Sequence, residues 1–146
     1  MLKVLIAEDE LTIADMIEQT LVNNGYDVCG IARNVDDAVA LARDHKPELA
    51  VIDLRLAGGG FGTEIAAQLG GPDRLGILYA SANICRVTLS AADGEACLIK
   101  PYSGPALLRG LEIVAEIVAT GKASQPFPPG FVLLSSPELA ALSLAS

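Results

Sequence analysis

The sequence has few positive charges, few cysteines and no tryptophan. Lys and Arg together number 10 against 18 Asp and Glu, so the formal net charge is −8. Proteins that bind the phosphate backbone use clustered Lys and Arg to displace counterions, so this balance argues against nucleic acid as a partner. The three cysteines form no CxxC pair, which offers neither a disulfide framework nor a zinc site. We interpret them as small buried apolar residues.

Long hydrophobic runs are also missing. The longest apolar stretches, 4–7 and 131–134, are far shorter than the roughly 20 residues that a membrane-spanning helix needs. Acidic residues at 8–10 follow too soon for the apolar region and cleavage site of a signal peptide. We therefore expect a protein of the cytoplasm with no membrane partner.

What the sequence does contain is enough apolar material for a core. Of its 146 residues, 51% are hydrophobic and only 19% are charged. At this length a chain buries on the order of two thirds of its unfolded surface in one domain. This composition excludes wholesale disorder.

Short apolar runs alternate with helical patterns over the first 120 residues. A helix within 83–94 is expected to be short and weak, because Val87 and Thr88 are poor helix formers. Parallel strands need crossover helices on both faces, so the alternation predicts an α/β fold with a doubly wound, five-stranded parallel sheet. The runs typical of buried strands are 4–7, 28–32, 49–52, 76–80 and 96–99.

Polar and glycine residues mark the expected helix ends. Asn34, Thr63 and Ser103 stand where an N-cap side chain would accept a backbone N–H. Gly25 and Gly121 stand where a left-handed residue would end a helix.

The composition changes at Lys122. Prolines and serines predict a linker, the apolar run 131–134 follows, and a short helix could begin at Pro137. We assign 1–121 to one domain and 122–146 to a Pro-rich linker and apolar C-terminal tail. The tail is too short for an effector domain of normal size, so we expect output through protein contact.

Polar side chains follow four of the predicted strands. In a parallel sheet these residues meet at one edge. Three carboxylates there would repel one another unless a cation lay between them, and oxygen ligands favour Mg²⁺ over zinc. Taken singly, each polar residue could be a helix cap, a helix-dipole partner or a solvated loop end. The residues are Glu8 and Asp9 after the first strand, Asp53 after the third, Ser81 after the fourth and Lys100 after the fifth.

These positions make the sequence resemble the receiver domain of two-component response regulators, of the stand-alone single-domain type. The resemblance spans residues 1 to about 120 and implies a flavodoxin-like (βα)5 fold. The matching segments are Ala7-Glu8-Asp9-Glu10, Val51-Ile52-Asp53-Leu54, Ser81-Ala82 and Lys100-Pro101.

The resemblance implies that Asp53 accepts a phosphoryl group from a sensor histidine kinase or a histidine phosphotransfer protein. The chain would act as a phosphorylation-controlled switch for an unknown downstream protein, or as a phosphorelay intermediate. Mg²⁺ would be held by Asp9, Asp53 and the backbone carbonyl of Arg55, with Glu8 acting through water. Lys100 and Ser81 would contact the phosphoryl group, and Arg55 and Asn83 would tune its lifetime.

The sequence departs from the family pattern on the side that most receivers use for output. The aromatic residue expected three positions before the lysine is Cys97, and only 18 residues separate Ser81 from Lys100. Ala57 replaces a common proline. We therefore predict that output is read through the third-helix loop or the C-terminal tail.

Two other functions stay open. A Mg²⁺-dependent phosphohydrolase with an aspartyl-phosphate intermediate would need a second acid two residues after the nucleophile, where this chain has Arg55. A degenerate receiver could serve as an unphosphorylated scaffold, although the intact Asp9, Asp53, Ser81 and Lys100 argue against it. Apolar residues on the last helix and the tail also leave a homodimer possible.

Overall fold

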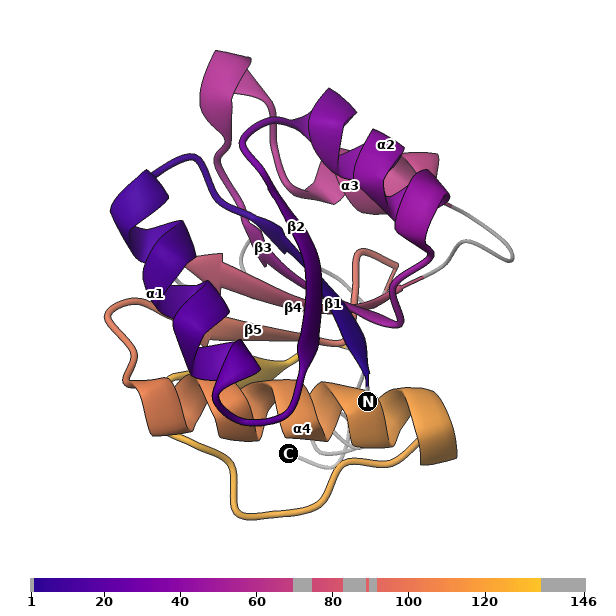
Figure 1. The fold of residues 1–146 in the computed structure, drawn as a ribbon. Coiled ribbons are helices and arrows are strands. Elements are labelled where there is room, and N and C mark those ends of the chain that lie inside the picture. Colours follow the sequence, from indigo (N-terminus) through magenta and orange to yellow (C-terminus); the bar gives the residue numbers. More distant parts are fainter. Residues whose placement is uncertain (1, 70–74, 83–88, 90–91, 135–146) are drawn as a thin grey trace.

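In the computed structural model, which describes residues 2–69, 75–82, 89 and 92–134, five parallel strands form a sheet in the order β2-β1-β3-β4-β5 (Figure 1). The predicted α/β class and its parallel strands are confirmed. The strands are β1 (Lys3–Ala7), β2 (Asp27–Ala32), β3 (Leu49–Asp53), β4 (Gly76–Ser81), β5 (Ala96–Ile99) and an additional β6 (Phe131–Leu133). The described helices are α1 (Leu11–Val22), α2 (Val35–His45), the short η1 (Ala57–Gly59), α3 (Thr63–Gln68) and α4 (Gly104–Thr120).

Helices cover both faces of the sheet (Figure 1). The pair α1 and α4 lies on one face, and α2 and α3 lie on the other. Alternate residues of β1 enter the two cores: Leu5 packs with α2 and α3, whereas Val4 and Ile6 pack with α1 and α4. Strands buried on both faces explain the continuous apolar runs of the sequence.

Most helix ends follow the sequence prediction. The Asn34 side chain accepts the Asp37 N–H at 2.8 Å, and Ser103 Oγ accepts the Ala106 N–H at 3.1 Å. Gly121 has φ +77° and ends α4. The prediction for Thr63 is wrong, because Thr63 is already the first helical residue and the N-cap is Gly62 with helical φ and ψ.

The apolar run that follows the predicted linker contains a strand. Residues Phe131–Leu133 form β6, which pairs antiparallel with β5 and makes the sheet six-stranded. An edge strand exposes unpaired N–H and C=O groups, and an apolar segment tethered nearby can satisfy them. The predicted helix from Pro137 and most of the weak helix at 83–94 lie outside the described residues, and residues 89 and 92–94, which are described, are not helical.

The cysteine interpretation is also corrected. Cys97 is disulfide-bonded, whereas Cys29 is free. A disulfide depends on two sulfur atoms meeting in the fold, and spacing along the sequence does not reveal that.

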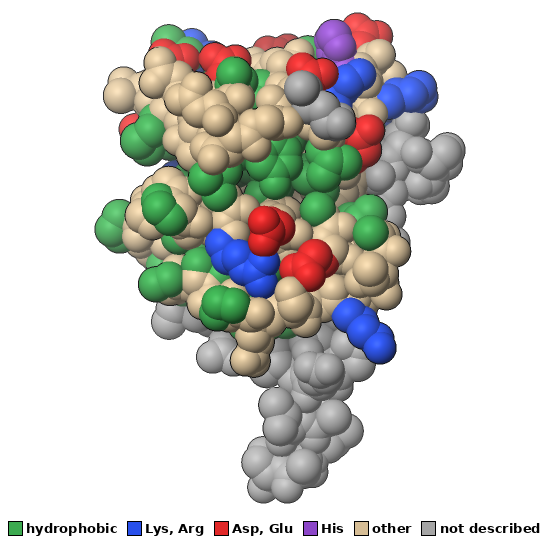
Figure 2. Space-filling view, turned by 60° about the horizontal axis from the view of Figure 1, so that its bottom comes forward, with side chains coloured by type: hydrophobic (Ala, Val, Ile, Leu, Met, Phe, Trp, Pro, Cys, Tyr) green, Lys and Arg blue, Asp and Glu red, His purple; other side chains and the backbone are tan. Residues whose placement is uncertain are grey.

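The surface carries charges of both signs. Figure 2 brings the α4 side of the molecule forward and shows Lys and Arg side chains beside Asp and Glu, scattered among hydrophobic ones. Within the described ranges, no helix is both long enough and apolar enough to cross a membrane.

Candidate functional site

Three acidic side chains and a lysine gather at the carboxyl edge of the parallel sheet. Glu8 and Asp9 follow β1, Asp53 is the last residue of β3, and Lys100 follows β5. One carboxylate oxygen from each of Glu8, Asp9 and Asp53 lies within 4.8 Å of the others. The central strands β1 and β3 are neighbours, so their ends place these acids together. The sequence predicted this meeting from strand ends alone.

Lys100 reaches across the site to two of the acids. Its Nζ lies 3.0 Å from Asp53 Oδ2 and 3.4 Å from Glu8 Oε1. The side chains of Lys100, Asp53 and Glu8 are 24%, 14% and 2% exposed. Charges this far from water interact more strongly than surface charges do. The ammonium therefore offsets the repulsion between the two carboxylates.

The titration of this cluster follows from its burial. Burial is the main reason why the pKa of Glu8 is raised from its ordinary 4.5 to about 7. The Glu10 N–H and the Lys100 charge lower this pKa, whereas the Asp53 charge raises it further. Burial would lower the pKa of Lys100, but its hydrogen bond to Asp53 and the charges of Asp53 and Glu8 outweigh burial and raise it. The ammonium is thus held in its charged form.

The loop after Asp53 closes tightly over its backbone. The Leu54 carbonyl accepts the Gly62 N–H at 2.8 Å, and Asp53 Oδ1 accepts the Arg55 N–H at 3.3 Å. A Cβ on Gly62 would stand only 2.4 Å from the Asp53 carbonyl oxygen and 2.6 Å from Ile52 Cγ2. Gly62 is therefore required for this loop. Sequence reasoning missed it, because a glycine-rich loop does not show which glycine meets another backbone.

The other residues that the sequence predicted for the site are Ser81, Arg55, Cys97 and Asn83. Ser81 is the last residue of β4 and is 6% exposed, and its carbonyl accepts the Lys100 N–H at 2.7 Å. The exposed Arg55 lies in the loop that follows Asp53. Cys97 is fully buried in β5 beside Tyr79, so the position of the expected aromatic lies inside the sheet. Asn83 lies outside the described residues.

Sequence reasoning also passed over Tyr102. Its hydroxyl is buried and makes no hydrogen bond to any described residue. Burial raises the pKa of this phenol, with the Lys100 charge opposing. Its ring lines a pocket between α1 and α4, with Met16, Ile17, Thr20, Gly104 and Leu107. In the sequence, the one feature that pointed to Tyr102 was its place two residues after Lys100.

Comparisons with known proteins agree on one family. The model of the response regulator receiver domain matches residues 4–112. The chain is 31% identical over 117 residues to the transcriptional regulatory protein PdtaR of Mycobacterium tuberculosis, covering 78% of this chain and 57% of that protein. It therefore spans little more than half the length of this curated relative.

Solved structures show the same fold. The signal receiver domain of a modulated diguanylate cyclase from Desulfovibrio desulfuricans superposes with a TM-score of 0.71 at 30% identity, covering 84% of this chain and 99% of that one. The response regulator PhyR from Brucella abortus gives a TM-score of 0.66 at 26% identity, covering 82% of this chain and 52% of that one. The chain belongs to the response regulator receiver domain family.

Proposed function

We propose that Asp53 accepts a phosphoryl group from the phosphohistidine of a sensor kinase or phosphotransfer protein. The observation that carries this proposal is the Asp53 carboxylate at the end of β3, which contacts Lys100 and has an oxygen within 4.8 Å of one carboxylate oxygen each of Glu8 and Asp9. In the reaction the phosphorus–nitrogen bond breaks, an Asp53 oxygen forms the new phosphorus–oxygen bond, and the imidazole leaves with the electron pair. Phosphoryl transfer depends mainly on positioning and charge neutralisation, which such a cluster can supply.

The donor set fits Mg²⁺. Glu8, Asp9 and Asp53 offer only oxygen atoms, the ligand type that Mg²⁺ prefers. We propose that Asp9, Asp53 and the Arg55 carbonyl hold the ion directly and that Glu8 acts through water. The ion would neutralise charge on the transferred group, while Lys100 and the Ser81 hydroxyl bind its oxygens.

The test is chemical labelling of Asp53. The full chain is incubated with acetyl phosphate and Mg²⁺, and intact-protein mass spectrometry measures the added phosphate. We expect label on the wild type, loss of that label on chelating the metal, and no label on Asp53→Asn. The exposed Asp36→Asn on α2 is the matched control and should label as the wild type does.

Other results would contradict the proposal. An unlabelled wild type would favour the scaffold function, and steady hydrolysis of many phosphate esters would favour the phosphohydrolase. Label retained in Asp53→Asn would place the acceptor elsewhere. For lifetime, we propose that the side chain of Arg55 shields the acyl phosphate, so Arg55→Ala should shorten its half-life.

We propose that the phosphorylated chain acts in the cytoplasm by binding a downstream protein. The chain would catalyse only its own phosphorylation and dephosphorylation. Its output would use the C-terminal segment, which lies against the last helix and beside β5. A chain ending at Gly121 tests this part: unchanged partner binding would exclude the tail as the output element.

A further inference from the structure

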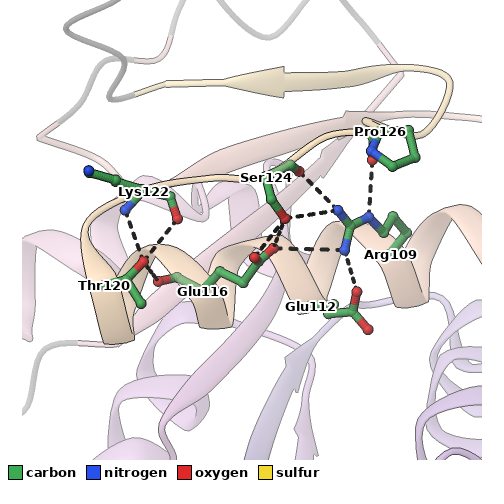
Figure 3. Close-up of polar contacts among 7 residues, drawn as sticks. All are labelled: Arg109, Glu112, Glu116, Thr120, Lys122, Ser124 and Pro126. Atoms are coloured by element: carbon green, nitrogen blue, oxygen red, sulfur yellow. Dashed lines mark hydrogen bonds and ion pairs between the residues drawn. The ribbon is translucent and has the colours of Figure 1, made fainter.

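The segment after α4 folds back along that helix and then joins the sheet. Its strand β6 pairs with residues 96–98 of β5, with Phe131 opposite Leu98 and Leu133 opposite Ala96. Figure 3 shows the chain from Lys122 to Pro126 running above α4, with side chains from the helix pointing up toward it. The segment 122–134 is called the strap below.

Arg109 is the centre of the polar contacts between α4 and the strap (Figure 3). Its Nε donates to the Pro126 carbonyl at 3.0 Å, and its Nη2 donates to the Ser124 carbonyl at 2.9 Å. Its Nη1 forms ion pairs with Glu112 and Glu116 of α4. Ser124 Oγ donates to the Glu116 carboxylate, at 2.7 Å from Oε2. One guanidinium therefore binds two carbonyls of the strap, those of Ser124 and Pro126, while it is paired with two carboxylates of α4.

Apolar contacts hold the far end of the strap. The ring of Phe131 packs with the core between the sheet and α4, and its centroid lies 5.2 Å from that of Phe127. A Cβ on Gly110 would stand 3.5 Å from the Phe131 ring, so this ring lies against the Gly110 turn of α4. Leu134 packs with the core on the opposite face. The strap thus touches both hydrophobic cores.

The strap also reaches the residue next to the site lysine. The Gly130 carbonyl accepts the Ile99 N–H at 2.9 Å, and Ile99 directly precedes Lys100. The Lys100 N–H is in turn bound to the Ser81 carbonyl, and Lys100 Nζ contacts Asp53. Gly130 has φ +79°, and a Cβ there would stand 3.3 Å from the Ile99 carbonyl oxygen. A continuous set of contacts therefore runs from Arg109 through the strap to Asp53.

We propose that docking of the strap and the phosphorylation state of Asp53 are coupled, so that phosphorylation loosens the strap and a loosened strap favours phosphorylation. The docked arrangement contains a direct Lys100–Asp53 contact of 3.0 Å. A phosphoryl group on Asp53 would lie between these side chains and displace the ammonium. Movement of Lys100 pulls on Ile99, whose N–H holds the start of β6. Coupling of two such events is reciprocal by linkage.

The proposal rests on the proposed function, and its test uses the full chain with Mg²⁺ and beryllium fluoride, a mimic of the phosphoryl group. Hydrogen exchange followed by mass spectrometry reports the amides of 95–99 and of the strap. On addition of the mimic we expect exchange of these amides to rise about tenfold, a typical size for coupling between sites. Asp53→Asn should show no such change.

The reciprocal half is tested with variants. Arg109→Gln should raise exchange of the strap without the mimic and tighten equilibrium binding of the mimic severalfold. Ser124→Ala should act in the same direction with a smaller effect. The matched control is Arg43→Gln, since Arg43 Nη2 donates to the Gln68 carbonyl between α2 and α3, and both readouts should stay at wild-type values.

Two results would overturn the coupling, and they differ from failure of the function. If acetyl phosphate labels Asp53 but strap exchange is equal with and without the mimic, the coupling is wrong and the function stands. If Arg109→Gln frees the strap but leaves mimic affinity unchanged, reciprocity fails and the coupling is again wrong. If Asp53 is not labelled by acetyl phosphate and the mimic does not bind, both the proposed function and the coupling are wrong.

Discussion

In two clusters of this molecule one cation contacts two carboxylates, yet the clusters work differently. At the sheet edge Lys100 lies between Asp53 and Glu8, which are 14% and 2% exposed. On α4, Arg109 lies between Glu112 and Glu116, which are 62% and 34% exposed. Buried charges shift each other's protonation, whereas exposed pairs contribute little energy in water. The first cluster is therefore suited to chemistry and the second to holding a chain segment by geometry.

The largest expected difference between the two regions is the loss of stability when a glycine is replaced by alanine. Gly62→Ala should destabilise the fold by about 3 kcal/mol, because its Cβ would meet the Asp53 carbonyl oxygen at 2.4 Å, and backbone cannot give way cheaply. Gly110→Ala in α4 is the control beneath the strap. Its Cβ would meet Leu78 and Phe131 side-chain ends at 3.3 Å or more, so we expect a change within about 1 kcal/mol. Urea denaturation measures both, and equal losses would contradict this interpretation of the loop.

The second prediction concerns pH and the buried cluster. The pKa of Glu8 is about 7 in the folded protein against 4.5 as its ordinary value, so the folded chain binds more protons in this range. The protonated Glu8 carboxyl should thus contribute its full stability below about pH 4.5. As the pH rises through about 7, the free energy of unfolding should fall by roughly 3 kcal/mol. Denaturation without divalent metal, from about pH 4.5 to 7.5, measures this loss.

Glu8→Gln supplies the comparison for that pH series. The variant cannot ionise at this position, so its stability should fall less than that of the wild type across the same range. Glu112→Gln on α4 removes an exposed carboxylate and serves as the control. A wild-type curve that rises through this range would contradict the assignment to Glu8.

The smallest expected effect is that of salt. Raising NaCl from about 0.1 M to about 1 M shortens the screening length from about 10 Å to about 3 Å, which weakens exposed ion pairs more than buried ones. We expect hydrogen exchange of 122–134 to rise by a few-fold, while that of 49–53 in β3 stays constant. Equal responses in both segments would show that burial does not separate the two clusters.

The sequence predicted much of the site because strand ends are easy to read. An apolar run that stops at an acid or a lysine shows where a buried strand meets its edge, as at Ile52 and Asp53. The N-caps at Asn34 and Ser103 were equally local and are confirmed. Thr63 failed because the preceding loop closes onto Asp53 and brings Gly62 into helical geometry, a constraint from outside the helix.

The strap was missed for a related reason. Residues 131–134 are apolar and follow a proline-rich stretch, which is typical of a tail. The strand has only three residues, 131–133, and so short a run shows no alternation that would predict a strand. Their partner is the free edge of β5, whose existence depends on the strand order of the whole sheet. The disulfide of Cys97 has the same character, since it depends on a distance in space.

By itself, the sequence determined the α/β class, the succession of strands and helices, and the polar residues that end the strands, because periodicity and capping act within a few neighbouring residues. Tertiary structure alone decided which acid would be buried enough for its pKa to rise, which glycine a loop could not do without, and where the last segment would dock. Those outcomes depend on distances between residues remote in sequence, and such distances exist only once the sheet has formed.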